Sequence, residues 1–464
     1  MARVMTVRKL LLVGCAFAAG AIAAPTVGEL AHSLGAPPGI LAAHAADGAD
    51  TDRLLALFGS VFDRVRADYV EPVPPKKLVE NALNGMLSGL DPHSNYMDQQ
   101  AFQDMQVQTR GQFGGLGLEV TQEKGYIKVV SPIDGTPAAR AGIKPGDLVV
   151  ALDDKTTQGL TLSEAVQRMR GTPGSTIRLT IARENAPQPI QVTLSREIIH
   201  VQVVHQRLFG DIGYVRLTTF DEQADNAIRQ AARSLEQQAG GHLRGFILDL
   251  RNDPGGLLDQ AVAVASDFLD RGEIVATRGR HTEDDKTWYA RTGGDILSDV
   301  PMVVLINDGT ASASEIVAGA LQDDARAVLV GTRSFGKGSV QTVIPLPGYG
   351  AIRLTTARYY TPSGRSIQGQ GIAPDITVMA GREERTQFGP VHESDLNHVL
   401  SNGGDHVEPA RPRNDLPSVA SSIPQEPPAG WPKYDQNKPE TDFQLQQALT
   451  VVRAMANQHR ASTQ

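Results

Sequence analysis

Three short apolar runs, GFILDL, PMVVLIN and AVLVG, recur between helix-like segments in the second half of the chain. They lack the polar alternation of a strand that has one face in water, so both faces are expected to be covered. The segments between them, such as GLLDQAVAVASDFLD and ASEIVAGALQD, carry apolar residues at helical spacing. This alternation predicts an α/β core with a largely buried sheet, which we place at residues 197–380.

A block with a different pattern precedes this core. Residues 106–196 contain strand-like runs, among them GGLGLEV, YIKVVSPI and STIRLTIAR, and one short helix in TLSEAVQRMRG. The helix is expected to begin with a capping box between Thr161 and Glu164 and to stop at Gly171. Because the block has its own turns and core, we interpret it as a mostly β module inserted into the chain.

The N-terminal part divides into two segments. Residues 50–105 show three-four apolar spacing and are expected to be helical. Residues 1–45 follow the plan of a secretory signal, in which a basic MARVMTVRK precedes an apolar run. Cleavage after Ala23, cleavage after Ala45 and retention as a signal anchor stay open. We expect an exported, periplasmic protein, held at the inner membrane if the segment is retained.

Charge and cysteine content exclude several function classes. The formal net charge of −8, without any Lys/Arg run, argues against a nucleic-acid partner. The single cysteine, Cys15, lies in the predicted signal, so the mature protein has no disulfide, thiol nucleophile or thiolate metal site. No ligand spacing such as H-E-x-x-H occurs, and we expect neither a metal nor another cofactor. Residues 381–440 are interpreted as a low-complexity linker before a last helix at 441–464.

The stretch GTRSFGKGSVQ, residues 331–341, begins like a nucleotide-binding P-loop. Gly338 stands where that motif needs Ser or Thr, and SVQTVIPLP predicts a strand where the motif needs a helix, so a nucleotide site is not favoured. Lys337 is then either a solvated surface charge or a packed lysine. The flanking glycines favour close packing, and burial lowers a lysine pKa toward neutrality.

The segment DGTASASE follows the buried strand PMVVLIN and begins a helix. Thr310, Ser312 and Ser314 are either ordinary N-caps, or one serine is a nucleophile beside free backbone N–H groups. The helix and the next strand return the chain to the same sheet edge, which would bring Lys337 beside the serines as their base. These residues alone do not choose between Ser312 and Ser314.

A second glycine turn, DLRNDPGG at residues 249–256, also follows a buried strand. Gly255 and Gly256 suit a second oxyanion donor, and an ordinary turn is an equal alternative. A Ser-His-Asp triad is less favoured, because no histidine near the core occupies a comparable turn. The histidines considered are His93, His200, His205, His242 and His281.

Taken together, these motifs resemble the carboxy-terminal processing peptidases, the tail-specific serine proteases of peptidase family S41. The resemblance covers roughly residues 50–380 and rests on SASE, FGKGSVQ, LRNDPGG, LDPHSNYM and YYTPSGRSIQGQGIAPDI. It implies a crotonase-like α/β protease core. It also implies that Ser312 is the nucleophile, Lys337 the general base and Gln341 the residue that orients the lysine. The preference for Ser312 over Ser314 comes from the resemblance.

The same resemblance assigns the oxyanion hole and a peptide site. The backbone N–H of Ala313 and of the Gly255–Gly256 turn would stabilise the oxyanion. The inserted block is similar to a PDZ domain, which would bind proteins or peptides with apolar C-termini. The positions carried over for this peptide site are Leu116, Gly117, Leu118, Ala165 and Met169, with Arg170 as a candidate relay to the protease.

The combined prediction is an exported serine endopeptidase that recognises C-terminal tails and cuts peptide bonds with a Ser–Lys dyad. One alternative is a non-catalytic PDZ-type scaffold, although a scaffold needs neither Ser312 nor Lys337. Another is a crotonase-like acyl-CoA enzyme, which the export signal disfavours. An activating adaptor and a homo-oligomer stay open.

Overall fold

The computed structural model describes residues 38–184, 186–381, 390–402, 413 and 415–463. The chain divides into two units, Met1–Ala82 and Leu83–Gln464. The first contains α3 (Pro38–Asp68) and the start of α4 (Pro75–Ser88), whose end belongs to the second unit. Most of the predicted signal lies outside the described residues. Within the part that is described, no helix has the length and hydropathy to cross a membrane.

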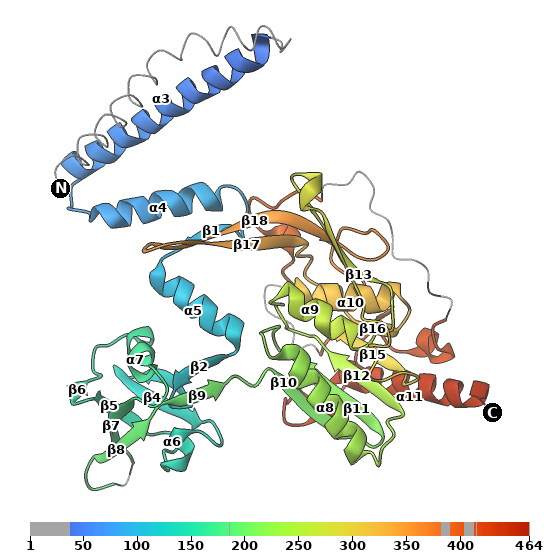
Figure 1. Ribbon diagram of the computed structural model, residues 1–464. Coiled ribbons are helices and arrows are strands. Elements are labelled where there is room, and N and C mark those ends of the chain that lie inside the picture. The colour runs from blue at the N-terminus through green and yellow to red at the C-terminus, as the bar shows by residue number, and fades with distance from the viewer. Residues whose placement is uncertain (1–37, 185, 382–389, 403–412, 414, 464) are drawn as a thin grey trace, which may run out of the picture. The chain divides into compact units, whose positions relative to one another are not determined.

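The α/β core is built on a six-stranded sheet (Figure 1). Strands β10 and β11 pair antiparallel, and all other neighbours pair parallel. Strands β12, β15 and β16 are buried along their whole length, as the three apolar runs predict. In sheet order the strands are β10 (Val204–Phe209), β11 (Ile212–Leu217), β12 (Gly245–Asp249), β15 (Met302–Ile306), β16 (Ala327–Gly331) and β19 (Ile376–Thr377).

Alternate side chains of the central strands enter two separate cores. On β15, Met302, Val304 and Ile306 pack into the cluster that includes residues of three helices, whereas Val303 and Leu305 pack into a cluster with the C-terminal helix. The first three helices are α8 (Ala224–Gln238), α9 (Leu258–Ser266) and α10 (Ala313–Asp323), and the last is α11 (Phe443–Thr463).

A second sheet contains the strand that follows the lysine motif. Its central strand β18 pairs with β17, β1 and β13, and β14 extends it beyond β13. The strand predicted for SVQTVIPLP is confirmed as β17. The short strand β1 was not predicted, because it lies within the segment expected to be helical. The bounds are β1 (Asn95–Met97), β13 (Glu273–Gly279), β14 (Lys286–Tyr289), β17 (Ser339–Leu346) and β18 (Gly350–Tyr360), and helix α5 (Gln99–Arg110) follows β1.

The inserted block is a separate mostly β module with its own core. A two-stranded ladder between β2 (Gln112–Gly115) and β9 (Glu197–His200) joins its entry and exit. The predicted capping box of Thr161 and Glu164 is present at the start of α7. The other elements are β3 (Leu118–Glu123), β4 (Tyr126–Pro132), α6 (Pro137–Arg140), β5 (Leu148–Leu152), β6 (Lys155–Thr156), α7 (Leu162–Met169), β7 (Thr176–Ala182) and β8 (Ile190–Ser195).

Several described residues of the stretch interpreted as a linker carry packed side chains. Ile423 is only 8% exposed and belongs to the same cluster as α11. The Trp431 ring meets the Phe443 ring edge-on, with 5.0 Å between the ring centroids. Short 3-10 turns occur at η2 (Glu393–Asp395), η3 (Ser418–Ser422) and η4 (Pro439–Thr441). The scattered apolar residues of a proline-rich sequence therefore contribute to the core.

Candidate active site

Ser312 lies at the N-cap of α10, directly after the turn that ends β15. Its backbone has φ 57° and ψ −116°, a sparsely populated conformation for a residue with a side chain. Such strain costs about 1–3 kcal/mol and is concentrated at functional sites. A serine on a sharp strand-to-helix turn presents its hydroxyl at the top of the sheet.

The two neighbouring hydroxyl groups are used to hold the turn. The hydroxyl of Thr310 donates to the Leu250 carbonyl at 2.8 Å, and that of Ser314 donates to the Asp253 carbonyl at 3.0 Å. Both residues are fully buried, whereas Ser312 is partly exposed. The geometry thus separates Ser312 from Ser314, a choice that the residue pattern alone left open.

Glu315 connects the serine to the loop that carries the lysine. Its Oε2 accepts the N–H of Ser312 at 2.8 Å and the N–H of Lys337 at 2.9 Å. Its Oε1 accepts the N–H of Gly336 at 2.7 Å and the hydroxyl of Ser334. The carboxyl group is fully buried, and burial raises its pKa to about 7 against the opposing effect of these hydrogen bonds. A single side chain therefore fixes the backbone of both candidate dyad residues.

Lys337 is half-buried in the loop between β16 and β17. Burial lowers the pKa of its ammonium group, and the positive charge of Arg353 lowers it further. The ammonium group forms no ion pair with any other described residue. A lysine in this environment loses its proton more easily than one in water, as a general base requires.

The structure gives Gln341 other partners than the lysine. Its side-chain amide donates to the hydroxyls of Ser339 at 3.0 Å and Thr355 at 3.2 Å. The orienting role of Gln341 therefore stays a prediction. The hydroxyl of Tyr359 instead donates to the Lys337 carbonyl oxygen. Tyr359 thus holds the lysine loop from β18.

The glycine turn after β12 lies against the serine. A Cβ added to Gly255 would come within 2.7 Å of the Ala313 nitrogen and 2.9 Å of the Ser312 Cβ. The N–H of Gly255 donates to Asp253 Oδ1 at 2.8 Å, so this donor is already used. The N–H groups of Ala313 and Gly256 have no acceptor among the described residues. These two amides, rather than that of Gly255, are the donors available for an oxyanion.

Asp253 is a buried acid in the same turn. It is fully buried, and its Oδ2 has no hydrogen-bond partner among the described residues. Burial raises its pKa to about 7. In its protonated form, Asp253 keeps its place beside Gly255 without burying an uncompensated charge.

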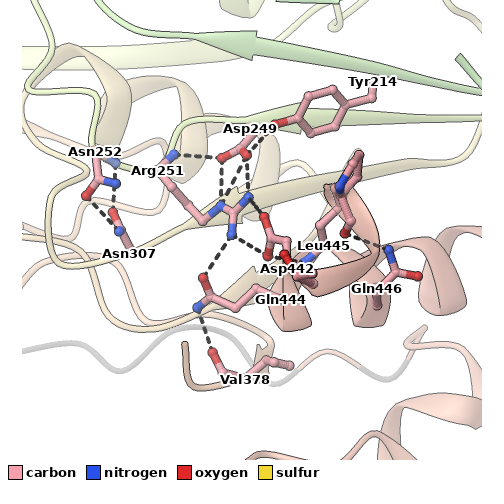
Figure 2. A network of polar contacts seen from close by, with 12 residues as sticks. Tyr214, Asp249, Arg251, Asn252, Asn307, Val378, Asp442, Gln444, Leu445 and Gln446 are labelled. Carbon is pink, nitrogen blue, oxygen red and sulfur yellow. Dashed lines mark hydrogen bonds and ion pairs between the residues drawn. The ribbon is translucent and has the colours of Figure 1, made fainter. Parts of the chain in front are cut away.

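Arg251 ties the turn to the C-terminal helix (Figure 2). Its guanidinium donates to Asp249 and, at 2.7 Å, to Asp442, which precedes α11. It also donates to Gln444 at 3.1 Å. Asn252 and Asn307 exchange hydrogen bonds at 2.9 Å, which joins this turn to the turn before Ser312 (Figure 2).

Three of the positions predicted for the peptide site lie in the core of the PDZ-like module. Ala165 is 0% exposed, and Met169 and Leu116 are buried in the same cluster. Their contact with a peptide stays a prediction. The helix turns this face inward. The apolar side chains that remain partly exposed over that core on β3 and α7 are Leu118, Val120, Leu162 and Val166.

The remaining two predicted positions have defined surroundings. Gly117 has φ +75°, and a Cβ there would lie 2.3 Å from Thr136. The carbonyls of Leu116 and Gly117 accept backbone N–H groups, while their own N–H groups have no acceptor among the described residues. Arg170 pairs with Asp104 of α5 at 3.2 Å and lies over the Phe113 ring. Relay by Arg170 stays a prediction.

A strained serine at a strand-to-helix turn, joined through Glu315 to a loop with a half-buried lysine on an α/β core, is an arrangement typical of serine-type peptidases. Family models agree: "Peptidase family S41" matches residues 211–378, "PDZ domain" residues 114–194 and "Activating protease CtpB N-terminal domain" residues 40–101. The protein named "Carboxy-terminal-processing protease" from Bartonella bacilliformis is 54% identical over 71% of this chain and 76% of its own length.

A more distant curated relative agrees with this family. The "Carboxyl-terminal-processing protease" of Synechocystis is 37% identical over 68% of this chain and 74% of its own length. A solved "Photosystem II D1 C-terminal processing protease" is 30% identical, covers 70% of this chain and 92% of its own, and gives a TM-score of 0.41. The chain belongs to peptidase family S41, among the carboxy-terminal-processing proteases, and carries a PDZ domain. The predicted fold class and family resemblance are confirmed.

Proposed function

We propose that this chain is an exported serine endopeptidase that recognises C-terminal tails through its PDZ domain and hydrolyses peptide bonds with a Ser312–Lys337 dyad. The observation that carries the proposal is the shared Glu315 carboxylate, which holds the backbone N–H of both residues. The lowered pKa of Lys337 supports its role as the base. The export part rests on the basic-then-apolar start of the sequence, and cell fractionation with N-terminal mass spectrometry tests it.

The mechanism follows from these positions. Neutral Lys337 takes the hydroxyl proton of Ser312 while the serine oxygen attacks the peptide carbonyl carbon. The N–H groups of Ala313 and Gly256 stabilise the resulting oxyanion. The protonated lysine then gives its proton to the leaving amine, which leaves an acyl-enzyme. Water, deprotonated by the lysine, releases the new C-terminus and restores the serine.

The PDZ domain supplies the tail preference. The N–H groups of Leu116 and Gly117 suit the terminal carboxylate, and a peptide strand would add beside β3. The partly exposed side chains over the core, Leu118 and Val120 on β3 with Leu162 and Val166 on α7, are all apolar. An apolar C-terminal residue is therefore the expected ligand, and a charged one would lose its hydration there.

The test compares the purified protein with Ser312→Ala and Ser314→Ala on an unfolded reporter that ends in either an apolar or a charged tail. We expect wild type to degrade the apolar-tailed reporter faster. Ser312→Ala should lose at least ~10⁴-fold in kcat/KM, the scale seen when a serine nucleophile is removed. Ser314→Ala removes a hydroxyl that holds the turn but no reacting atom, so its loss should be much smaller than that of Ser312→Ala. Equal losses in the two variants would refute the nucleophile assignment. Binding of the tail without any cleavage by wild type would favour the scaffold alternative.

A further inference from the structure

A second buried carboxylate, that of Glu393, lies beside the lysine loop. Glu393 belongs to η2, and its side chain is fully buried. Both of its oxygens lie 2.9 Å from His93 Nε2, and Oε1 accepts the side-chain amide of Gln368 at 3.0 Å. A carboxyl group is this completely buried only when it is hydrogen-bonded or paired, and both conditions are met here.

Glu393 holds the lysine loop at both of its ends. Its backbone N–H donates to the Phe335 carbonyl at 3.0 Å, two residues before the lysine. Its carboxylate fixes Gln368, whose Oε1 accepts the N–H of Gly338 at 2.9 Å, directly after Lys337. The lysine loop is thus held by Glu315, which belongs to α10, and by Glu393, which belongs to η2.

The charged groups around Lys337 have different hydrogen-bond partners. Glu315 uses its oxygens on backbone N–H groups and a hydroxyl, and Asp91 accepts hydrogen bonds from Ser94 and from the hydroxyl of Thr355 on β18. Arg353 on β18 donates to Asn95. Glu393, Glu315 and Asp91 each favour the charged lysine, with Glu393 the strongest of the three, whereas burial and Arg353 oppose it. Two further ionisable groups belong to this network: His93, which is hydrogen-bonded to Glu393, and the hydroxyl of the buried Tyr359, which donates to the Lys337 carbonyl.

We propose that Glu393 is a positioning residue for Lys337, which holds the lysine loop at both ends and places a negative charge near the ammonium group. This inference rests on the proposed role of Lys337 as the general base. A nearby negative charge makes the lysine a stronger base, while the loop contacts keep it aimed at the serine. Burial thus lowers the pKa of Lys337, whereas Glu393 raises it.

The test uses the pH profile of kcat/KM, because its acidic limb reports the free enzyme's base. Glu393→Gln keeps the side-chain shape and an acceptor for Gln368 but removes the charge. We expect the acidic limb to move to lower pH, with kcat on the plateau within about threefold of wild type. Glu283→Gln, which removes an exposed carboxylate from η1 (Thr282–Asp284), is the matched control and should leave the limb in place.

A second measurement does not depend on turnover. In the Ser312→Ala background, an amine-directed reagent and peptide mass spectrometry give the pH at which Lys337 becomes reactive. Adding Glu393→Gln should lower that pH. If both the limb and the labelling pH stay unchanged in a folded Glu393→Gln protein, the inference is overturned while the dyad stands.

Two further variants separate the remaining outcomes. If Glu393→Gln does not fold, Glu393→Asp is tested instead. This variant keeps the negative charge on a shorter side chain, so kcat should fall at least ~10-fold while the acidic limb of the pH profile stays at the same pH. An unchanged kcat in Glu393→Asp would overturn the positioning role. Full activity in Lys337→Ala would instead refute the proposed function itself, and with it this inference.

Discussion

Replacement of Gly255 by alanine tests the close contact between the glycine turn and the serine turn. The added Cβ would lie 2.6 Å from the Ala311 oxygen, 2.7 Å from the Ala313 nitrogen and 2.9 Å from the Ser312 Cβ. These gaps fall about 0.5 to 0.8 Å short of the 3.4 Å at which ordinary contact begins. All three atoms belong to the turn that carries the serine. The turn or the glycine loop must therefore move.

The expected magnitude follows from two physical effects. Alanine at φ +93° costs about 1–2 kcal/mol of backbone strain, and the overpacked contact costs about 1–3 kcal/mol if nothing moves. A shift that relieves the contact displaces the serine and the Ala313 amide by several tenths of an ångström. Misplacement on the scale of 1 Å costs about 10²-fold in rate. We expect a loss between ~10-fold and ~10²-fold in kcat/KM, mainly in kcat.

The assay measures kcat and KM on the apolar-tailed reporter, with the melting temperature recorded for each variant. Gly210→Ala is the matched control, because Gly210 has φ +71° but open space around a new Cβ. The control shares the backbone strain without the contact, so its kcat should stay near wild type. A folded Gly255→Ala variant with kcat/KM within about threefold of wild type would show that the serine turn does not depend on this contact.

Two other predictions concern buried charge and tail recognition. Asp253 has its pKa raised by burial to about 7, so the folded state loses stability as pH rises from the ordinary aspartate range to about 7. The free energy of unfolding of Asp253→Asn relative to wild type should grow over that range by up to about 4 kcal/mol and then level off. Urea unfolding at several pH values measures this difference. A difference that does not change with pH would contradict the raised pKa of Asp253 as its cause. Val166→Asp should abolish binding of apolar-tailed peptides in a titration, whereas Val130→Asp, at a position 44% exposed on β4, should not. Equal binding by the two variants would place the peptide elsewhere.

The sequence predicted the features that a local pattern encodes, which are the buried strands and the helix capping box. The buried strands at 245–249, 302–306 and 327–331 are recognisable because each is a continuous apolar run. The capping box at Thr161 is readable because a short spacing encodes it. The same Ser-x-x-Glu spacing occurs at Ser312 and Glu315, and it could have revealed the connection between serine and lysine loop.

Other features depend on contacts that no local pattern encodes. The pairing of His93 with Glu393 joins residues 300 positions apart. The choice between Ser312 and Ser314 depends on which hydroxyl is buried against the Asp253 carbonyl. Ala165 was assigned to the peptide site by the resemblance to PDZ domains, and no local pattern shows that its side chain is fully buried in the module's own core.

The shared Glu315 carboxylate has a consequence for the order of folding. Its contacts with Ser312 and Lys337 span 3 and 22 residues, within one stretch that runs through β15, α10 and β16. Short loops close at lower entropic cost than long ones, so we expect this framework to form early. Pulse-labelled hydrogen exchange should detect early protection of residues 302–331. The pairs His93–Glu393 and Arg251–Asp442, 300 and 191 residues apart, would close last. A newly made chain would then bring Ser312 and the loop of Lys337 together before the distant contacts around them have formed.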